Sequence, residues 1–361
     1  MNTAHHETFM RRALELARLG GGAVAPNPLV GAVLVSGGRI LAEGWHKSFG
    51  GPHAEVECLR PLGDGQLPAD AILYVTLEPC SHQGKTPPCA DLLIARGLQR
   101  VVVAHEDPFP EVAGRGIAKL RGAGVKVTVG VGEHEARWTN RRFLMSVQEK
   151  RPYIILKWAR SADGFLDKRP RTERGVQRIT CAATDVVTHG WRAMEQAILV
   201  GSRTVVHDDP SLTVRHVPGR HPLRVVIDRN GITPDASQVY DSQAPTLLFT
   251  RTPRTGPAIE QHLLQDDADP LDQVLHELHR RGIRSLLVEG GAQLHHAFLQ
   301  RGLWDETRII QGRPRFGDGT PAPVISTAPL RTVVSDVDTI EHHLDPASPI
   351  ATHAPLPTWP W

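Results

Sequence analysis

The chain has 361 residues and four cysteines, and its 41 basic and 39 acidic side chains leave a formal net charge of only +2. This length predicts two or three domains, and the near balance of charge argues against a broad nucleic-acid-binding surface. Without an apolar run of roughly 18 residues, a signal peptide or a disulfide framework, we expect a cytoplasmic protein that has no membrane partner.

The first 150 residues alternate between helical and strand patterns. Apolar residues at helical spacing from Phe9 to Ala17 predict a helix that ends at the glycines 20–22. Strands are expected at 30–35, 40–45, 71–77, 101–105 and 125–129, and further helices at 55–60, 88–95 and 133–147. Such alternation predicts an α/β sandwich with helices on both faces of the sheet.

A histidine, a glutamate and two cysteines in this half form the pattern of a zinc-dependent hydrolytic deaminase. His53 and Glu55 stand at the start of one expected helix and Cys89 at the start of another, while Cys80 follows a buried strand. An imidazole and two thiolates leave a fourth position on Zn²⁺ for water, whose pKa the metal lowers. Glu55 is spaced to move protons between this water and the departing amine, so it is the predicted catalytic residue. The predicted metal ligands are His53, Cys80 and Cys89.

Other interpretations of these residues stay open. The pair His53 and Glu55 alone is weak evidence, because histidine and glutamate share exposed helix turns in many proteins. Cys80 and Cys89 could form a disulfide, or zinc could be purely structural with His82 as a fourth ligand. The usual deaminase signature separates its cysteines by two residues, whereas eight residues lie between them here.

That longer spacing belongs to a resemblance with a known family. The segments 25–31, 44–46, 51–55 and 78–89 are similar to the deaminase half of the bifunctional riboflavin-biosynthesis deaminase/reductases. The resemblance is close over residues 5–150 and patchier up to about residue 325. It implies a cytidine-deaminase-like three-layer sandwich. It also implies substrate contacts at Asn27, His46, His82, Lys85 and Thr86, although Lys85 on its own would suggest only a solvated loop.

The second half begins near Arg151 and carries segments that resemble the reductase of the same family. These segments are 157–164, 197–205, 208–215 and 288–292. Strands are expected at 153–159 and 285–288 and a helix at 293–300, so the paired glycines 290–291 lie where backbone amides can approach a phosphate. The resemblance implies a dihydrofolate-reductase-like α/β domain in which NADPH carries the hydride chemistry.

The resemblance also implies which residues form the reductase site. Expected NADPH contacts are Ala159, Thr204, Asp208, Gly291, Ala292, Gln293 and Leu294. Expected substrate contacts are Arg192, Leu212, Arg215 and Glu289. Both arginines suit a phosphate because the planar guanidinium matches its oxygens, although each taken singly could equally form a surface salt bridge.

Two parts of the second half depart from the family pattern. Val176 and Arg178 stand where a serine and a tryptophan are usual, within a basic run. We expect Arg178, or a neighbouring arginine, to reach a phosphate of NADPH or of the substrate. The tail from about residue 327 lies beyond the segments that carry the resemblance, and its prolines predict an irregular extension.

These observations predict a deaminase domain (1–150), a reductase domain (151–326) and an irregular extension (327–361). The predicted enzyme hydrolyses the 2-amino group of 2,5-diamino-6-ribosylamino-4(3H)-pyrimidinone 5′-phosphate and then reduces the ribosyl group to ribityl. Zn²⁺ and NADPH are the expected cofactors, and we expect a homo-oligomer with no nucleic-acid partner. The alternatives are a deaminase with a degenerate reductase domain, a nucleic-acid base deaminase with an accessory domain, and a binding protein with structural zinc.

Overall fold

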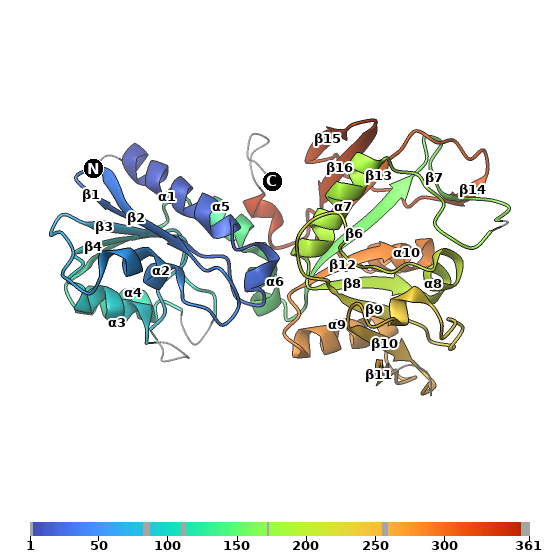
Figure 1. Cartoon of the computed structure of the whole chain (residues 1–361), viewed down its shortest axis with the longest axis horizontal. Helices are drawn as coiled ribbons and strands as arrows, with labels where there is room; N and C mark the ends of the chain where they lie inside the picture. Colours follow the sequence, from blue (N-terminus) through green and yellow to red (C-terminus); the bar gives the residue numbers. More distant parts are fainter. Residues whose placement is uncertain (1–2, 82–86, 110–112, 172, 255–258, 355–361) are drawn as a thin grey trace. The chain divides into compact units, whose positions relative to one another are not determined.

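The computed structural model describes residues 3–81, 87–109, 113–171, 173–254 and 259–354, and the chain divides into two compact units. The first unit comprises Met1–Glu149 with Thr352–Trp361, and the second comprises Lys150–Ala351. Figure 1 shows the helices and strands of each unit. Within these described ranges, no helix is both long enough and apolar enough to cross a membrane.

The first unit is built on a five-stranded sheet in the order β2-β1-β3-β4-β5. Strand β1 is antiparallel to β2 and β3, whereas β3, β4 and β5 are parallel. The strands are β1 (Gly31–Ser36), β2 (Arg39–Trp45), β3 (Ile72–Val75), β4 (Arg100–Val103) and β5 (Lys126–Val129). The helices are α1 (Thr3–Arg18), η1 (Gly21–Val24), α2 (Ala54–Leu59), η2 (Arg60–Leu62), α3 (Cys89–Ala95), α4 (Arg115–Gly122), α5 (Glu133–Thr139) and α6 (Arg141–Gln148).

Alternating side chains of this sheet pack against helices on both faces, because successive residues of a strand point to opposite sides. Leu73 and Val75 of β3 pack in one core with α2, α3 and α4. Ile72 and Tyr74 pack in the other core with α1 and α5. Figure 1 shows the two helical layers on either side of the sheet. The predicted three-layer sandwich is therefore confirmed.

One predicted helix is interrupted. The chain from residue 133 to 148 forms α5 and α6, and Asn140 between them has φ −96° and ψ 15°, outside the usual helical values. The Asn140 side chain accepts the backbone N–H of Leu29 at 2.8 Å and donates to its carbonyl oxygen at 3.0 Å. The prediction of one continuous helix over 133–147 is wrong, because Asn140 is held by a segment far away in the sequence.

The second unit is built on a nine-stranded sheet in the order β11-β10-β9-β8-β12-β6-β13-β16-β15. In this order, all neighbouring strands from β11 through β13 are parallel. Strands β14 and β7 form a separate two-stranded antiparallel sheet. The strands are β6 (Tyr153–Arg160), β7 (Phe165–Lys168), β8 (Ala197–Gly201), β9 (Leu223–Ile227), β10 (Thr246–Thr250), β11 (Glu260–Leu263), β12 (Ser285–Gly290), β13 (Glu306–Gln311), β14 (Gly319–Pro321), β15 (Arg331–Ser335) and β16 (Asp338–Leu344). The helices are α7 (Ala182–Met194), α8 (Ser202–Asp208), η3 (Gln238–Tyr240), α9 (Pro270–Arg280) and α10 (Ala292–Gln300). The short helix η4 (Ala351–His353) begins at the last residue of this unit in the sequence.

The tail is more ordered than its composition suggests. Strand β16 pairs antiparallel with β13, and β15 pairs antiparallel with β16, so both extend the sheet of the second unit. The prediction of an irregular extension is wrong over 331–344. Pro329 precedes β15, and the other five prolines of the tail lie after residue 344. The β-branched residues of 331–344 favour a strand, and the edge of β13 offers free backbone hydrogen-bonding groups.

Candidate active sites

Three metal-binding side chains converge in the first unit. His53 immediately precedes α2, Cys89 begins α3, and Cys80 lies in the loop after β3. One ligand atom from each, the imidazole Nδ1 and the two Sγ atoms, lies within 4.8 Å of the others. His53 Nδ1 lies 3.6 Å from Cys80 Sγ and 3.3 Å from Cys89 Sγ.

These separations fit a tetrahedral zinc ion. Zn–N bonds of about 2.0 Å and Zn–S bonds of about 2.3 Å place a nitrogen and a sulfur ligand about 3.5 Å apart. The measured distances of 3.3 and 3.6 Å lie on either side of this value. Cys80 and Cys89 are free thiols, which removes the disulfide alternative.

The charge state of the cysteines also suits a metal. The hydrogen bond with Cys89 lowers the pKa of the Cys80 thiol to about 4, and the same contact raises the pKa of Cys89. The two sulfurs therefore share one proton and titrate together. Because the thiolate is the form that binds a metal, one ligand of the cluster is already in its binding form at neutral pH.

Glu55 is a buried carboxyl beside this cluster. It lies in the first turn of α2 and is only 3% exposed. Burial raises its pKa to about 7. Glu57, two residues further on, instead pairs with Lys47 at 2.7 Å and with Arg60 at 2.8 Å. A carboxyl that titrates near neutral pH can both accept and return a proton, which is what a deaminase requires of Glu55.

Two of the predicted substrate contacts of this unit lie next to the metal ligands. The side-chain Nδ2 of Asn27 and Nε2 of His46 are 3.1 Å apart, and His46 Nδ1 lies 2.8 Å from the Pro52 carbonyl oxygen. The ring centroids of His46 and His53 are 5.8 Å apart. The structure therefore brings Asn27 and His46 to the site. His82, Lys85 and Thr86 lie outside the described residues.

Glu78, which the sequence interpretation missed, anchors the loop that carries Cys80. Its carboxylate is 4% exposed. It accepts backbone N–H groups at 2.8 to 3.2 Å from Asp107, Gly114, Gly116 and Ile117. The signal in the sequence was a charged residue at the end of an apolar strand, directly before Pro79 and Cys80.

The second unit contains a cavity of about 1300 Å³. It is lined by residues at the carboxyl ends of β6, β8, β9 and β12, where open parallel sheets bind their ligands. All twelve residues predicted for the reductase site line it, namely Ala159, Arg178, Arg192, Thr204, Asp208, Leu212, Arg215, Glu289, Gly291, Ala292, Gln293 and Leu294.

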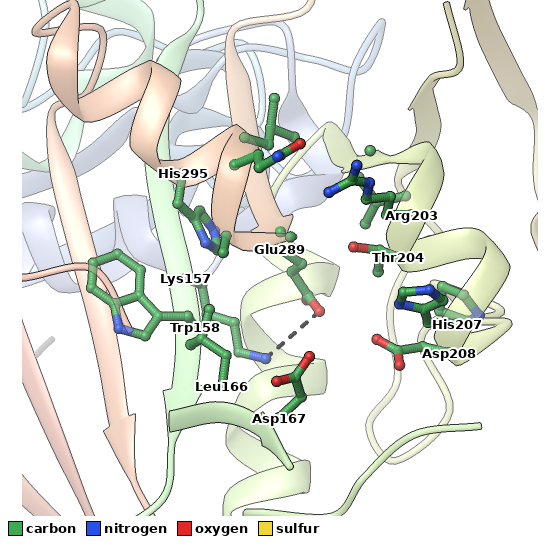
Figure 2. Close-up of a pocket in the computed structure, with 18 of the residues that line it drawn as sticks. Lys157, Trp158, Leu166, Asp167, Arg203, Thr204, His207, Asp208, Glu289 and His295 are labelled. Carbon is green, nitrogen blue, oxygen red and sulfur yellow. Dashed lines mark ion pairs between the residues drawn. The ribbon is translucent and has the colours of Figure 1, made fainter. Parts of the chain in front are cut away.

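Lys157 and Glu289 form a buried charged pair in this cavity and point toward one another in Figure 2. Lys157 Nζ lies 3.6 Å from Glu289 Oε2, and the Lys157 side chain is 14% exposed. Burial would raise the pKa of Glu289, but Arg192 and Lys157 outweigh it and hold that pKa well below its usual range. Lys157 was not predicted as a site residue, although a lysine within the apolar strand β6 was a signal for one.

Arg192 forms a bidentate salt bridge with Glu289. Its Nε and Nη2 donate to the two carboxylate oxygens of Glu289, both at 2.8 Å, and its Nη1 donates to the Thr213 carbonyl oxygen at 3.3 Å. The predicted position of Arg192 in the cavity agrees with the structure. Because the Arg192 guanidinium already binds a carboxylate of the protein, Arg215 is the more available of the two arginines that were predicted to bind a phosphate.

The junction of β12 and α10 fits a cofactor phosphate. Gly290 has φ +120°, a backbone conformation that favours glycine. A Cβ atom added to Gly291 would lie 3.2 Å from Thr204 Oγ1, so a larger residue would crowd the space between β12 and α8. The first amides of α10 lack partners within the helix and can face a phosphate. The residues present therefore fit NADPH.

Two other predicted cofactor contacts are held by neighbouring charges. Arg178 donates to Asp185 at 2.5 Å. Asp208 accepts from Arg171 at 2.5 Å, and burial raises the pKa of Asp208 although Arg171 opposes this. Arg178 or a neighbouring arginine was expected to reach a ligand phosphate. In the structure Arg171 and Arg178 are instead paired with carboxylates that line the same cavity.

Comparison with known proteins finds a match for each unit. Residues 3–105 match the family described as the cytidine and deoxycytidylate deaminase zinc-binding region, and residues 152–343 match the RibD C-terminal domain. The riboflavin biosynthesis protein RibD of Bacillus amyloliquefaciens is 41% identical over 328 residues, covering 88% of this chain and 86% of the relative. RibD of Escherichia coli (strain K12) is 41% identical over 320 residues, covering 83% and 85%.

Solved structures agree with these matches. The diaminohydroxyphosphoribosylaminopyrimidine deaminase/5-amino-6-(5-phosphoribosylamino)uracil reductase of Thermotoga maritima has a TM-score of 0.83 and 36% identity, covering 94% of this chain and 98% of that chain. Acinetobacter baumannii RibD has a TM-score of 0.86 and 33% identity, covering 95% and 99%. The predicted combination of a cytidine-deaminase-like and a dihydrofolate-reductase-like fold is confirmed.

Proposed function

The chain belongs to the RibD family of riboflavin-biosynthesis proteins, and we propose that its first unit deaminates the pyrimidine substrate and its second unit then reduces the product. The chain is a bifunctional deaminase and reductase with zinc and NADPH as cofactors. We infer that its substrates are the two compounds in the name of the Thermotoga enzyme. The deaminase substrate is a diaminohydroxyphosphoribosylaminopyrimidine, and the reductase substrate is 5-amino-6-(5-phosphoribosylamino)uracil. The observation that carries this assignment is the convergence of His53, Cys80 and Cys89 beside buried Glu55.

In the first unit, His53, Cys80 and Cys89 would hold the zinc ion. When bound, zinc supplies a water of lowered pKa. Glu55 accepts a proton from the attacking water and delivers it to the amino group, which leaves as ammonia. Asn27 beside the ligand set would orient the pyrimidine, since its carboxamide can both donate and accept hydrogen bonds.

In the second unit, reduction of the ribosyl group to ribityl adds one hydride, which NADPH supplies, and one proton. Lys157 is the best-placed acid for that proton, because its ammonium lies in the cavity and is held 3.6 Å from Glu289. Gly291 and the first turn of α10 would bind a cofactor phosphate. Arg215, which has no carboxylate partner among the described residues, would bind the substrate phosphate.

Separate assays of the two half-reactions test this function. The purified zinc-loaded chain should release one ammonia per diamino substrate without NADPH. The same preparation should oxidise one NADPH per molecule of authentic deaminated intermediate. Ammonia release without NADPH oxidation would favour a deaminase with a degenerate reductase unit, and the absence of both would contradict the assignment.

A cytoplasmic location and a homo-oligomeric assembly remain predictions for this chain. Cell fractionation tests the first. Sedimentation velocity of the purified full chain over a range of concentrations tests the second, because a homo-oligomer should sediment faster than its 39.6 kDa monomer. A concentration-independent monomer would contradict the expected assembly.

A further inference from the structure

We propose that His189 is a substrate-binding residue of the reductase unit, and that its Nε2–H group donates a hydrogen bond to the substrate phosphate beside Arg215. This inference rests on the proposed reductase function. His189 lies on α7 three residues before Arg192 and lines the same cavity as Arg192 and Arg215. Residues three apart on a helix share a face, so His189 and Arg192 look onto the same space.

The protonation of the His189 ring follows from one hydrogen bond. Its Nδ1 accepts the backbone N–H of Arg215 at 2.9 Å. A backbone N–H can only donate, so Nδ1 carries no proton, and a neutral ring must carry its proton on Nε2. The His216 ring packs edge-on against the imidazole, with centroids 4.4 Å apart and an interplanar angle of 75°. The ring is therefore held with a defined donor, Nε2–H.

The charges around the ring keep it neutral. Burial lowers the pKa of His189 to about 4; Arg192, Arg215 and His216 lower it as well, whereas Glu289 acts in the opposite direction. At neutral pH the ring is therefore a hydrogen-bond donor and not a cation. Within the described residues, the Nε2–H group of His189 has no acceptor. His189 is only 4% exposed and lines the cavity, so a ligand in the cavity is the acceptor available to this donor.

The nearby cations make an anion the most suitable acceptor. Arg192 is neutralised by Glu289 through two hydrogen bonds of 2.8 Å. Arg215 donates to hydroxyl groups and has no carboxylate partner among the described residues. A phosphate that contacts Arg215 would gain the uncompensated charge and, from Nε2–H of His189, a fixed neutral donor. Both predicted substrates carry such a phosphate.

Two substitutions separate the roles of the two ring nitrogens. His189→Asn keeps an acceptor near the position of Nδ1 and removes the Nε2–H donor, whereas His189→Gln places an amide N–H near the position of Nε2 and removes the acceptor. We expect His189→Asn to raise KM for the deaminated substrate about 10-fold or more, the range for a hydrogen bond to a charged group, and His189→Gln to raise it less. KM for NADPH should stay unchanged in both variants, which also reports that the unit is folded.

A dephosphorylated form of the deaminated substrate identifies the acceptor. The wild type and His189→Asn should then have the same KM, because the phosphate that distinguishes them is gone. The proposal is overturned if His189→Asn matches the wild type on the phosphorylated substrate while His189→Gln is impaired, since His189 would then serve only to position the backbone of Arg215. A penalty that persists without the phosphate overturns it as well. A wild-type chain that oxidises no NADPH with authentic intermediate refutes the reductase function itself, and this inference with it.

Discussion

In the first unit the reacting groups occupy two short segments, 53–55 and 80–89, whereas in the second unit they are spread from Lys157 to Leu294 around one cavity. The first site has to hold one ion with three atoms that lie within 4.8 Å of one another. The second has to enclose a dinucleotide and a sugar phosphate in about 1300 Å³. Its charged groups are accordingly numerous, and most of them are paired with one another.

This difference has a consequence for substitutions. Removing one of three metal ligands leaves too few to hold the ion, so a single substitution in the first site should abolish zinc binding and deamination together. Removing one contact from the large cavity leaves many others, so each single substitution in the second site should remove only part of the reductase activity. Substitutions in one unit should leave the other reaction intact.

The largest expected effect comes from Cys80→Ala. The variant should lose its zinc and all measurable ammonia release, because an imidazole and a single thiolate hold zinc poorly. NADPH oxidation with the deaminated intermediate should be unchanged. Metal analysis of the purified protein and the two separate assays measure this outcome.

Cys58→Ala is the matched control. Cys58 is a free thiol as well, but it is buried on α2. Its Sγ donates to the Ala42 carbonyl oxygen at 3.5 Å, and burial raises its pKa to about 12. This variant should keep one zinc per chain. A Cys80→Ala protein with full zinc content would contradict the proposed ligand set.

The next effect is expected for Glu55→Gln. The amide keeps the shape of the side chain but cannot accept and return a proton. Zinc content should be retained and ammonia release should fall about 10²- to 10⁴-fold, the usual contribution of a general acid/base. Glu57→Gln on the same helix is the control, because Glu57 is paired with Lys47 and Arg60 and should not affect the chemistry. Normal deamination by Glu55→Gln would exclude the proposed proton transfer.

A smaller, pH-dependent effect is expected in the second unit. Burial lowers the pKa of Lys157, whereas the charge of Glu289 opposes this shift. If the Lys157 ammonium is the acid, reduction should fall as pH rises through this lowered pKa, which lies below the ordinary value of about 10.4. Glu289→Gln removes the opposing charge, so the alkaline limb of the pH–rate profile should move to lower pH.

Profiles of kcat/KM for reduction, recorded from pH 6 to about 10, measure this shift. Lys157→Met should remove the alkaline limb and lower the rate about 10²-fold. Lys168→Met is the control, because Lys168 is exposed and does not line the cavity. An alkaline limb that stays in place in both Lys157→Met and Glu289→Gln would show that another group provides the proton.

The same contrast explains what could be predicted from the sequence. His53, Cys80 and Cys89 could be predicted because residue type, spacing and helix starts together specify a metal site. The positions of eleven reductase residues could be predicted from the resemblance and that of Arg178 from the divergent basic run, since all twelve line the cavity. Their partners could not be predicted. Whether Arg178 meets a ligand or Asp185 depends on how the segment after β7 packs against α7, and that packing leaves no local pattern.

Two errors in the fold have the same origin. Asn140 interrupts a helix because its side chain binds the backbone of Leu29, 111 residues earlier in the chain. Residues 331–344 become strands because β13 presents an edge to them. In both cases the local sequence allows more than one structure, and a distant partner selects one of them.

The smallest expected effect concerns Arg178, the one predicted cofactor contact that stands in a divergent position. Its side chain is 64% exposed and pairs with Asp185 at 2.5 Å. Exposed ion pairs contribute only about 0.2 to 1 kcal/mol, so Arg178→Ala should raise KM for NADPH or for the substrate by less than about tenfold. The rise should be larger at low salt, where charges are least screened. Arg220→Ala, at an exposed arginine outside the cavity, should change neither constant. A rise well above tenfold would mean that Arg178 leaves Asp185 to bind a ligand phosphate directly, and the expectation that the second site loses activity only in small steps would then be wrong for this contact.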